Sequence, residues 1–287
     1  DTIIVATQAL THERAAEALR PLVNRDQVLI LNPNLIGGAL QFARVLRANG
    51  ADRMPALVGF STLTYGCRAE GGRVDILVKV ARLAAGVFPS SRSVGILPGI
   101  VRYFPGVVPA ADVLDAGLTN ANPVIHPPIA ILNAARFENP GEVYFYRDGV
   151  SPKVARLIEL LDAERLSLRK TLGYASMTDP ELCVKQGYAE SAEYFACYAR
   201  GSGFAKFTAP KTLDHRYFHE DIGLGLVLFI WLGERLGVPT PAARAVVAMG
   251  SLISEQDYLG RREAVAGSLG LDGLTPERLK TYLRTGV

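Results

Sequence analysis

The stretch DTIIVATQALTHERAAEALRPLVNRDQVLILNPN, residues 1–34, decides the fold. It opens with an apolar, β-branched run at residues 1–7, which predicts a buried parallel strand. Residues 12–23 carry alanines and leucines at helical spacing. A second apolar run at residues 27–34 ends in Asn-Pro-Asn and indicates another strand. Strand, helix and strand in this order predict a parallel sheet covered by helices.

The same alternation continues through the first third of the chain. Residues 36–50 predict a helix that stops at an Asn-Gly pair. Further strands are expected at PALVGFS (residues 55–61), RVDILVKVA (73–81) and SVGILP (93–98). We therefore expect residues 1–111 to form an α/β domain with a doubly wound sheet.

The second part of the chain, residues 112–287, has the pattern of an all-α domain. Three helices are expected to begin at Ser151-Pro152, Thr240-Pro241 and Thr275-Pro276, where a hydroxyl N-cap precedes a proline. The run GLGLVLFIWLGERLG, residues 223–237, is apolar on nearly all sides and predicts a central core helix.

The composition excludes several classes of protein. The 287 residues carry a net charge of only +3, with no run of Lys and Arg to bind nucleic acid. Three scattered cysteines, Cys67, Cys183 and Cys197, lack metal spacing and leave one unpaired, so no disulfide framework is expected. The longest strictly apolar run, residues 226–232, is far shorter than the ~20 residues of a membrane helix. We expect a cytoplasmic protein that acts on small molecules, without nucleic-acid or membrane partners.

A sheet domain followed by a helical domain is common in enzymes that bind a dinucleotide. Such enzymes place G-x-G-x-x-G after the first strand, where phosphate meets backbone N–H groups. The sequence contains neither this pattern nor G-x-x-x-x-G-K-[ST]. Because the chain opens at Asp1 directly in a strand, we expect the glycine unit to precede Asp1. The alternative is that the protein binds no dinucleotide.

Several segments together carry a family resemblance. LTNANPVIHPPIAILNAARFE (residues 118–138) resembles the hallmark of the opine dehydrogenases, the octopine and nopaline dehydrogenase family. In the same order along the chain, LILNPNLIGGALQF (29–42), STLTYGCRAEGGRV (61–74), YRDGVSPKVARLIELLDAER (146–165) and HRYFHEDIGLGLV (215–227) resemble other signatures of that family.

The resemblance implies a partial Rossmann-type sheet followed by a helical substrate and catalytic domain. It also implies an NAD- or NADP-dependent reductive condensation. The amine of an amino acid condenses with a 2-oxo acid such as pyruvate, and hydride reduces the imine to an opine. The sequence leaves open which amino acid is used, which of the two cofactors binds, and whether the protein is a homodimer.

His126 and Asp221 are the expected catalytic pair. His126 precedes two prolines, which disfavour the helical region before them, so we expect an exposed imidazole at a helix break or start. Such a histidine can exchange protons with a carbonyl oxygen or an amine. The resemblance gives His126 this acid–base role and makes Asp221 the carboxylate that fixes its tautomer. The alternatives are a packed structural histidine and, for Asp221, an N-cap of the following helix.

Three further residues are candidates for binding the substrates. Asn122 lies four residues before His126, and the resemblance places it near the substrate or the nicotinamide ribose, although it could simply cap a turn. Arg216 is the first candidate for clamping a substrate carboxylate or the cofactor pyrophosphate, and Arg68 is the second, with a surface ion pair as the alternative for each. Cys67 is expected to be a small buried hydrophobe because hydride chemistry needs no thiol.

Cofactor contacts are expected where the first two strands end, because dinucleotides bind at the carboxyl edge of such sheets. No metal site is expected: His215 and His219 are spaced i, i+4, but no further ligand pattern accompanies them, so a solvated pair is preferred. The candidate cofactor residues are Ala6, Thr7, Gln8, Asn32, Gly37 and Gly38, although the entry of a helix would also need the two glycines.

Two other functions remain open at this stage. One is a reductase that makes a 2-hydroxy acid, similar to ketopantoate reductase. The other is a truncated, non-catalytic homologue that serves as a binding module, as the absent glycine loop would allow. An assay with a 2-oxo acid, with and without an amino acid, separates the first alternative from an opine dehydrogenase.

Overall fold

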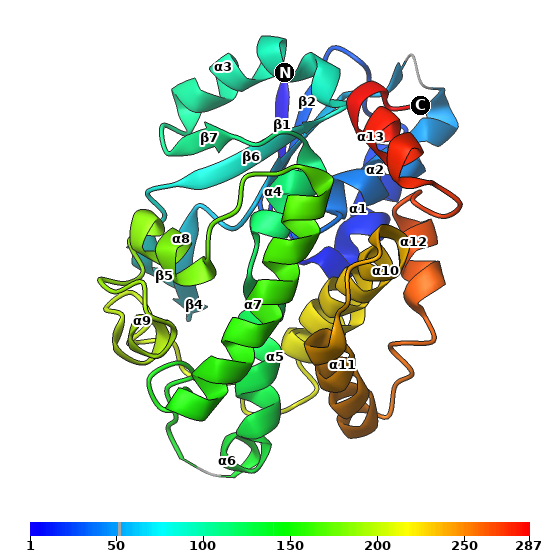
Figure 1. The fold of residues 1–287 in the computed structure, drawn as a ribbon. Helices are drawn as coiled ribbons and strands as arrows, with labels where there is room; N and C mark the ends of the chain where they lie inside the picture. Colours follow the sequence, from blue (N-terminus) through cyan, green and yellow to red (C-terminus); the bar gives the residue numbers. More distant parts are fainter. Residues whose placement is uncertain (51–52, 140) are drawn as a thin grey trace. The chain divides into compact units, whose positions relative to one another are not determined.

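The computed structural model describes residues 1–50, 53–139 and 141–287 (Figure 1). The chain divides into two compact units. Unit 1 comprises Asp1–Leu63, Arg82–Asn120 and Glu263–Val287, and unit 2 comprises Thr64–Ala81 and Ala121–Arg262. These units differ from a simple division between residues 111 and 112, because residues 64–81 belong to unit 2 and residues 112–120 and 263–287 belong to unit 1.

Unit 1 is built on a five-stranded sheet with the order β1-β2-β3-β6-β7. Neighbouring strands are parallel except for the antiparallel pair of β3 and β6, so the α/β prediction is confirmed for a predominantly parallel sheet. The strands are β1 (Thr2–Val5), β2 (Val28–Leu31), β3 (Ala56–Phe60), β6 (Leu83–Phe88) and β7 (Val107–Pro109).

The helices of unit 1 include the two that were expected between the first strands. The segments are η1 (Ala9–Thr11), α1 (His12–Leu19), α2 (Gly38–Leu46), η2 (Arg47–Asn49), η4 (Ser90–Arg92), α3 (Ser93–Tyr103), α4 (Val113–Thr119), α12 (Arg262–Ser268) and α13 (Pro276–Thr285). The start of α4 packs closely on β6, where a Cβ on Gly86 would lie 2.0 Å from the backbone oxygen of Asp112. Glycine at this position therefore permits the close approach of helix and strand.

Three strand predictions need correction. Residues 93–98 are not a strand but the start of helix α3, because a short apolar run does not distinguish the two. Residues 73–81 contain the strand β5 (Arg73–Lys79), which pairs antiparallel with β4 (Tyr65–Glu70) in a separate two-stranded sheet of unit 2. The opening strand β1 is parallel to β2 as expected, but it lies at the sheet edge and Ile4 is half exposed rather than buried.

Unit 2 is mainly helical. Its helices are α5 (Asn122–Leu132), α6 (Ala134–Glu138), α7 (Pro152–Leu172), α8 (Asp179–Gln186), α9 (Tyr194–Arg200), η5 (Tyr217–Leu226), α10 (Val227–Leu236) and α11 (Pro241–Ser254). The segment η5 is a π-helix that runs directly into α10. Phe229 and Trp231 on α10 are almost fully buried, which confirms the predicted core helix.

The three predicted Ser/Thr-Pro helix starts are all present. Ser151 and Thr275 cap α7 and α13 with their hydroxyl groups. Thr240 makes no such bond, and the Glu164 carboxylate instead accepts the N–H groups of Ala242 and Ala243 at the start of α11. Within the described residues, no helix combines the length and the hydrophobicity needed to cross a bilayer.

Candidate active site

His126 lies inside helix α5 and is almost fully buried, with 3% of its surface exposed. This corrects the expectation of an exposed imidazole at a helix break. The two prolines that follow His126 lie inside α5, where they remove two backbone donors, and the helix nevertheless continues to Leu132. The helix thus holds the imidazole rigidly in the interior of unit 2.

Asp221 lies on the π-helix η5 and contacts the same imidazole. Its Oδ2 is 2.8 Å from Nδ1 of His126, and Asp221 is only 1% exposed. Asp221 is inside η5, which begins at Tyr217, so it is not the N-cap of a following helix. Single π-helical segments occur often at functional sites, because they re-aim side chains along a helix. The structure therefore brings the predicted pair together over 95 residues of sequence.

The other ring nitrogen of His126 has a partner that sequence reasoning missed. Nε2 lies 2.9 Å from the hydroxyl group of Tyr146. A carboxylate can only accept a hydrogen bond, so the neutral imidazole carries its proton on Nδ1 and Nε2 accepts from Tyr146. Tyr217 lies over the imidazole face with ring centroids 4.2 Å apart, and Phe145 meets it edge-on at 5.7 Å. The imidazole is thus enclosed by one carboxylate and three aromatic rings.

Burial lowers the pKa of His126, because the charged imidazolium loses its hydration. Asp221 acts in the opposite direction and raises this pKa, while Arg216 and Arg68 lower it further. Burial has the largest effect and the pKa of His126 is lowered overall, so the imidazole is neutral near pH 7. Asp221 can still stabilise an imidazolium that forms transiently during a reaction.

Arg216 and Arg68 both belong to unit 2 and lie close enough to affect the charge of His126. Arg216 immediately precedes η5 and forms an ion pair of 3.0 Å with the buried Glu220. Arg68, on β4, is exposed, lies over the ring of Phe207 at 4.7 Å and donates from Nη1 to the carbonyl oxygen of Cys67 at 3.3 Å. A guanidinium has five N–H donors, so neither arginine is saturated by these partners.

The remaining candidates of unit 2 are placed as follows. Asn122 is the first residue of α5, half-buried and four residues before His126 on the same helix. Cys67 is half-buried on β4, which is less burial than expected. His219 is not simply solvated: it bonds to Asp214 at 2.7 Å and to Tyr258 at 2.8 Å.

His215 is also only half-exposed, and burial lowers its pKa to about 4, so it is not a solvated histidine either. Its Nδ1 accepts the backbone N–H of Tyr217. Within the described residues, no group of three or more His, Cys, Asp or Glu side chains is arranged to hold a metal ion.

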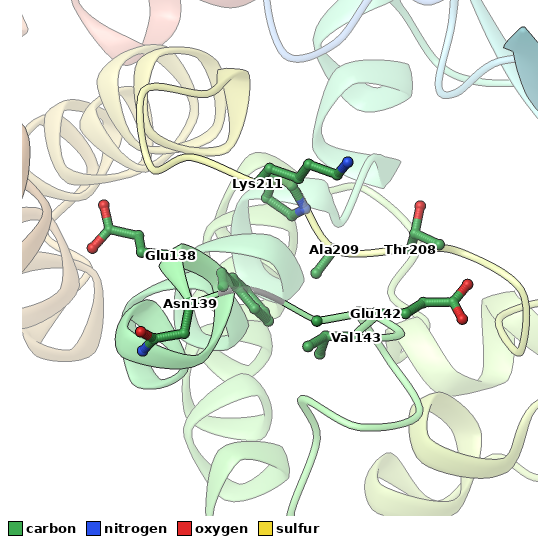
Figure 2. A pocket seen from close by; sticks show the side chains of 10 residues that line it. Glu138, Asn139, Glu142, Val143, Thr208, Ala209 and Lys211 are labelled. Atoms are coloured by element: carbon green, nitrogen blue, oxygen red, sulfur yellow. The ribbon is translucent and has the colours of Figure 1, made fainter.

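Unit 2 also contains an open pocket of about 660 Å³ that does not include His126 among its lining residues (Figure 2). It lies where the end of α6 meets the segment from Thr208 to Lys211. Glu138, Glu142 and Lys211 provide its charges, and in Figure 2 the two glutamates point to opposite sides. None of the predicted site residues lines this pocket.

The cofactor candidates lie in unit 1. Ala6, Thr7 and Gln8 are exposed just after β1, at the carboxyl end of a parallel strand, and this position fits a dinucleotide. Asn32 is buried, and its backbone N–H donates to the carbonyl of Val5.

Gly37 and Gly38 have a packing role in the structure. A Cβ on Gly37 would lie 2.6 Å from the side chain of Leu269, and one on Gly38 would lie 2.5 Å from the ring of His12. The first N–H groups of α2 are also used internally, because Gly38 and Ala39 donate to the carbonyl and side-chain oxygens of Asn34. These two glycines therefore serve the entry and packing of α2, and the fit to a cofactor rests on residues 6–8.

The chain is similar to known opine dehydrogenases. The family described as NAD/NADP octopine/nopaline dehydrogenase, alpha-helical domain, matches residues 109–254. Opine dehydrogenase of Arthrobacter sp. (strain 1C) is 32% identical over 98% of this chain and 78% of that protein. Vitopine synthase of Allorhizobium ampelinum is 29% identical over 78% of this chain, and the match spans 62% of that synthase.

Solved structures share the fold. Octopine dehydrogenase in complex with NADH and L-arginine superposes with a TM-score of 0.77 over all of this chain and 78% of that chain, at 18% identity. Yersinopine dehydrogenase with NADP+ bound superposes with a TM-score of 0.69 over 99% of this chain and 78% of that chain, at 16% identity. The chain belongs to the octopine/nopaline dehydrogenase family, whose members are NAD- or NADP-dependent oxidoreductases that act on a CH–NH bond.

Proposed function

We propose that this protein condenses an amino acid with a 2-oxo acid such as pyruvate and reduces the product to an opine. The observation that carries the proposal is the buried His126–Asp221 pair, with Arg216 and Arg68 in its electrostatic neighbourhood. Relatives described as opine dehydrogenase and vitopine synthase support the class of product. Octopine dehydrogenase structures described with L-arginine and with pyruvate support the class of substrates.

The proposed chemistry needs one group that can both accept and donate protons. The amine attacks the ketone only when it is neutral, and the resulting hydroxyl group leaves only when it is protonated. His126 supplies both functions: its neutral Nε2 is the final acceptor of the amine's proton, and the imidazolium is the source of the proton that the departing oxygen receives. Asp221 keeps the proton on Nδ1 and stabilises the imidazolium.

The substrates must also be held in place, because both carry carboxylates. Arg216 is our choice for binding the carboxylate of the 2-oxo acid, since a guanidinium holds a carboxylate through two parallel hydrogen bonds. Arg68 and Asn122 are our choices for the amino acid. The hydrogen bond from Arg216 to the carboxylate of Glu220 orients the guanidinium before the substrate binds.

NADH or NADPH, when bound, supplies the hydride that reduces the imine carbon. We assign Ala6, Thr7 and Gln8 to its binding, because they are exposed at the carboxyl end of β1.

The test is oxidation of NADH or NADPH by the protein expressed from its complete gene. We expect oxidation with pyruvate to depend on an added amino acid, with a secondary-amine dicarboxylate as the product. Oxidation with the 2-oxo acid alone would indicate a reductase that makes a 2-hydroxy acid. Absence of oxidation with a panel of amino acids and 2-oxo acids would contradict the proposal.

A further inference from the structure

Tyr146 is hydrogen-bonded to Nε2 of His126, the nitrogen that the proposed chemistry requires. Its hydroxyl group lies 2.9 Å from Nε2, and within the described residues it is the hydrogen-bond partner of that atom. His126 and Tyr146 are 3% and 7% exposed. A substrate therefore cannot reach Nε2 directly while Tyr146 keeps this position.

The ring of Tyr146 is held by its surroundings. Its centroid lies 4.5 Å from that of Phe204, 5.0 Å from Phe145 and 6.0 Å from Phe207. Aromatic packing of this density disfavours a rotation that would move the hydroxyl group away from His126. The hydroxyl group is therefore held in its hydrogen bond to Nε2 of His126.

The charges around Tyr146 fit a group that passes protons without holding a charge. Burial raises the pKa of Tyr146 well above its usual value, so the side chain does not persist as a phenolate. Arg216 lies close enough to act on the charge of both Tyr146 and His126. A carboxylate bound to Arg216 would bring the adjacent carbonyl group towards the same hydroxyl.

We propose that the hydroxyl group of Tyr146 is a proton relay between Nε2 of His126 and the reacting oxygen of the substrate. When the hydroxyl group of the condensation product leaves, the imidazolium gives its Nε2 proton to the oxygen of Tyr146. In the same step Tyr146 gives its own proton to the departing oxygen, the C–O bond breaks, and water and the protonated imine form. In the reverse direction the oxygen of Tyr146 accepts a proton from water and passes its own to Nε2. This inference rests on the proposed function.

The test compares Tyr146→Phe with Tyr188→Phe, a matched control. Tyr188 stacks on Phe204 at 4.9 Å but makes no hydrogen bond to His126 among the described residues. We expect Tyr146→Phe to lower kcat about 100-fold or more, the scale of a lost proton transfer, while each KM stays within about threefold. We expect Tyr188→Phe to stay within about twofold of the wild type in kcat.

A second readout separates a relay from a residue that only positions His126. The proton on Nδ1, bonded to Asp221, should keep its downfield NMR resonance in Tyr146→Phe, because the pair with Asp221 does not need the tyrosine. Loss of that resonance together with activity would overturn the relay and make Tyr146 a positioning residue. Full activity of Tyr146→Phe would overturn any role in the proton transfer.

If Tyr146→Phe does not fold, the relay can be tested in the wild-type protein by measuring kcat in mixtures of H2O and D2O. A plot of kcat against the fraction of D2O should be curved, because two protons move in one step. A straight line would overturn the relay. Failure of the proposed function is distinguishable, because the wild-type protein would then show no amine-dependent oxidation of NADH or NADPH at all.

Discussion

Nδ1 of His126 and Oδ2 of Asp221 lie 2.8 Å apart in the interior of unit 2, on two helices that contribute one residue each. A buried carboxylate beside a buried imidazole is costly unless the two groups compensate each other. Removing either side chain deprives the other of this hydrogen bond in the protein interior. The same pair of side chains therefore contributes to the stability of unit 2 and to the chemistry that we propose.

Replacing Gly86 tests the close approach of helix α4 to strand β6. A Cβ at this position would meet the backbone oxygen of Asp112 at 2.0 Å, and a backbone atom cannot move aside cheaply. We expect Gly86→Ala to destabilise the protein by about 1–3 kcal/mol or more, as overpacking does. The control is Gly95→Ala in helix α3, where a Cβ meets nothing within 4 Å and a gain of roughly 0.5–1 kcal/mol is expected.

Urea unfolding of both glycine variants measures these differences. Equal stability of Gly86→Ala and the wild type would mean that α4 does not pack on β6 as described.

The pH dependence of stability tests the burial of His12. Burial lowers the pKa of His12 from 6.5 to about 4 in the folded protein. The unfolded chain therefore takes up this proton first, so stability that is present above pH 6.5 is lost as the pH falls towards 4. A shift of this size corresponds to roughly 3 kcal/mol. Between pH 8 and pH 5, the free energy of unfolding measured with urea should decline less steeply in His12→Gln than in the wild type. Identical slopes would contradict the lowered pKa of His12.

Replacing Arg216 tests how the 2-oxo acid is bound. Lysine keeps the positive charge but cannot form two parallel hydrogen bonds to a carboxylate. We expect Arg216→Lys to raise the KM of the 2-oxo acid about 10- to 100-fold, as the loss of a charge-assisted hydrogen bond would. The control is Arg156→Lys, whose side chain is exposed and paired with Glu159 on α7. Steady-state kinetics that show the same KM in both variants would exclude Arg216 from carboxylate binding.

Periodicity and helix signals predicted much of the fold. The strands at residues 2–5, 28–31 and 56–60 and the helices that start at Pro152 and Pro241 all follow from local pattern. The pattern could not show that β5 joins β4 in a separate sheet, because alternation identifies a strand and not its partner. Nor could it show that the last helix, α13, belongs to unit 1, since long-range contacts decide that.

The site was predicted in part. His126 and Asp221 were identified through the family resemblance, and the structure shows why two distant residues meet. Tyr146 and Tyr217 were missed, because aromatic residues near a turn have the pattern of ordinary core residues. The exposed imidazole was also a wrong expectation, since the helix α5 accommodates both prolines after His126.

The pH profile of Asp221→Asn tests the central claim most directly. Asp221 raises the pKa of His126 against the lowering effect of burial, so its neutral replacement should lower that pKa. We predict that the part of the kcat profile that reports His126 moves to lower pH and that kcat falls about 10²- to 10⁴-fold while the fold survives. Asp214→Asn, which changes an exposed carboxylate bonded to His219, should leave both unchanged. An Asp221→Asn protein with an unaltered pH profile and full activity would contradict the account.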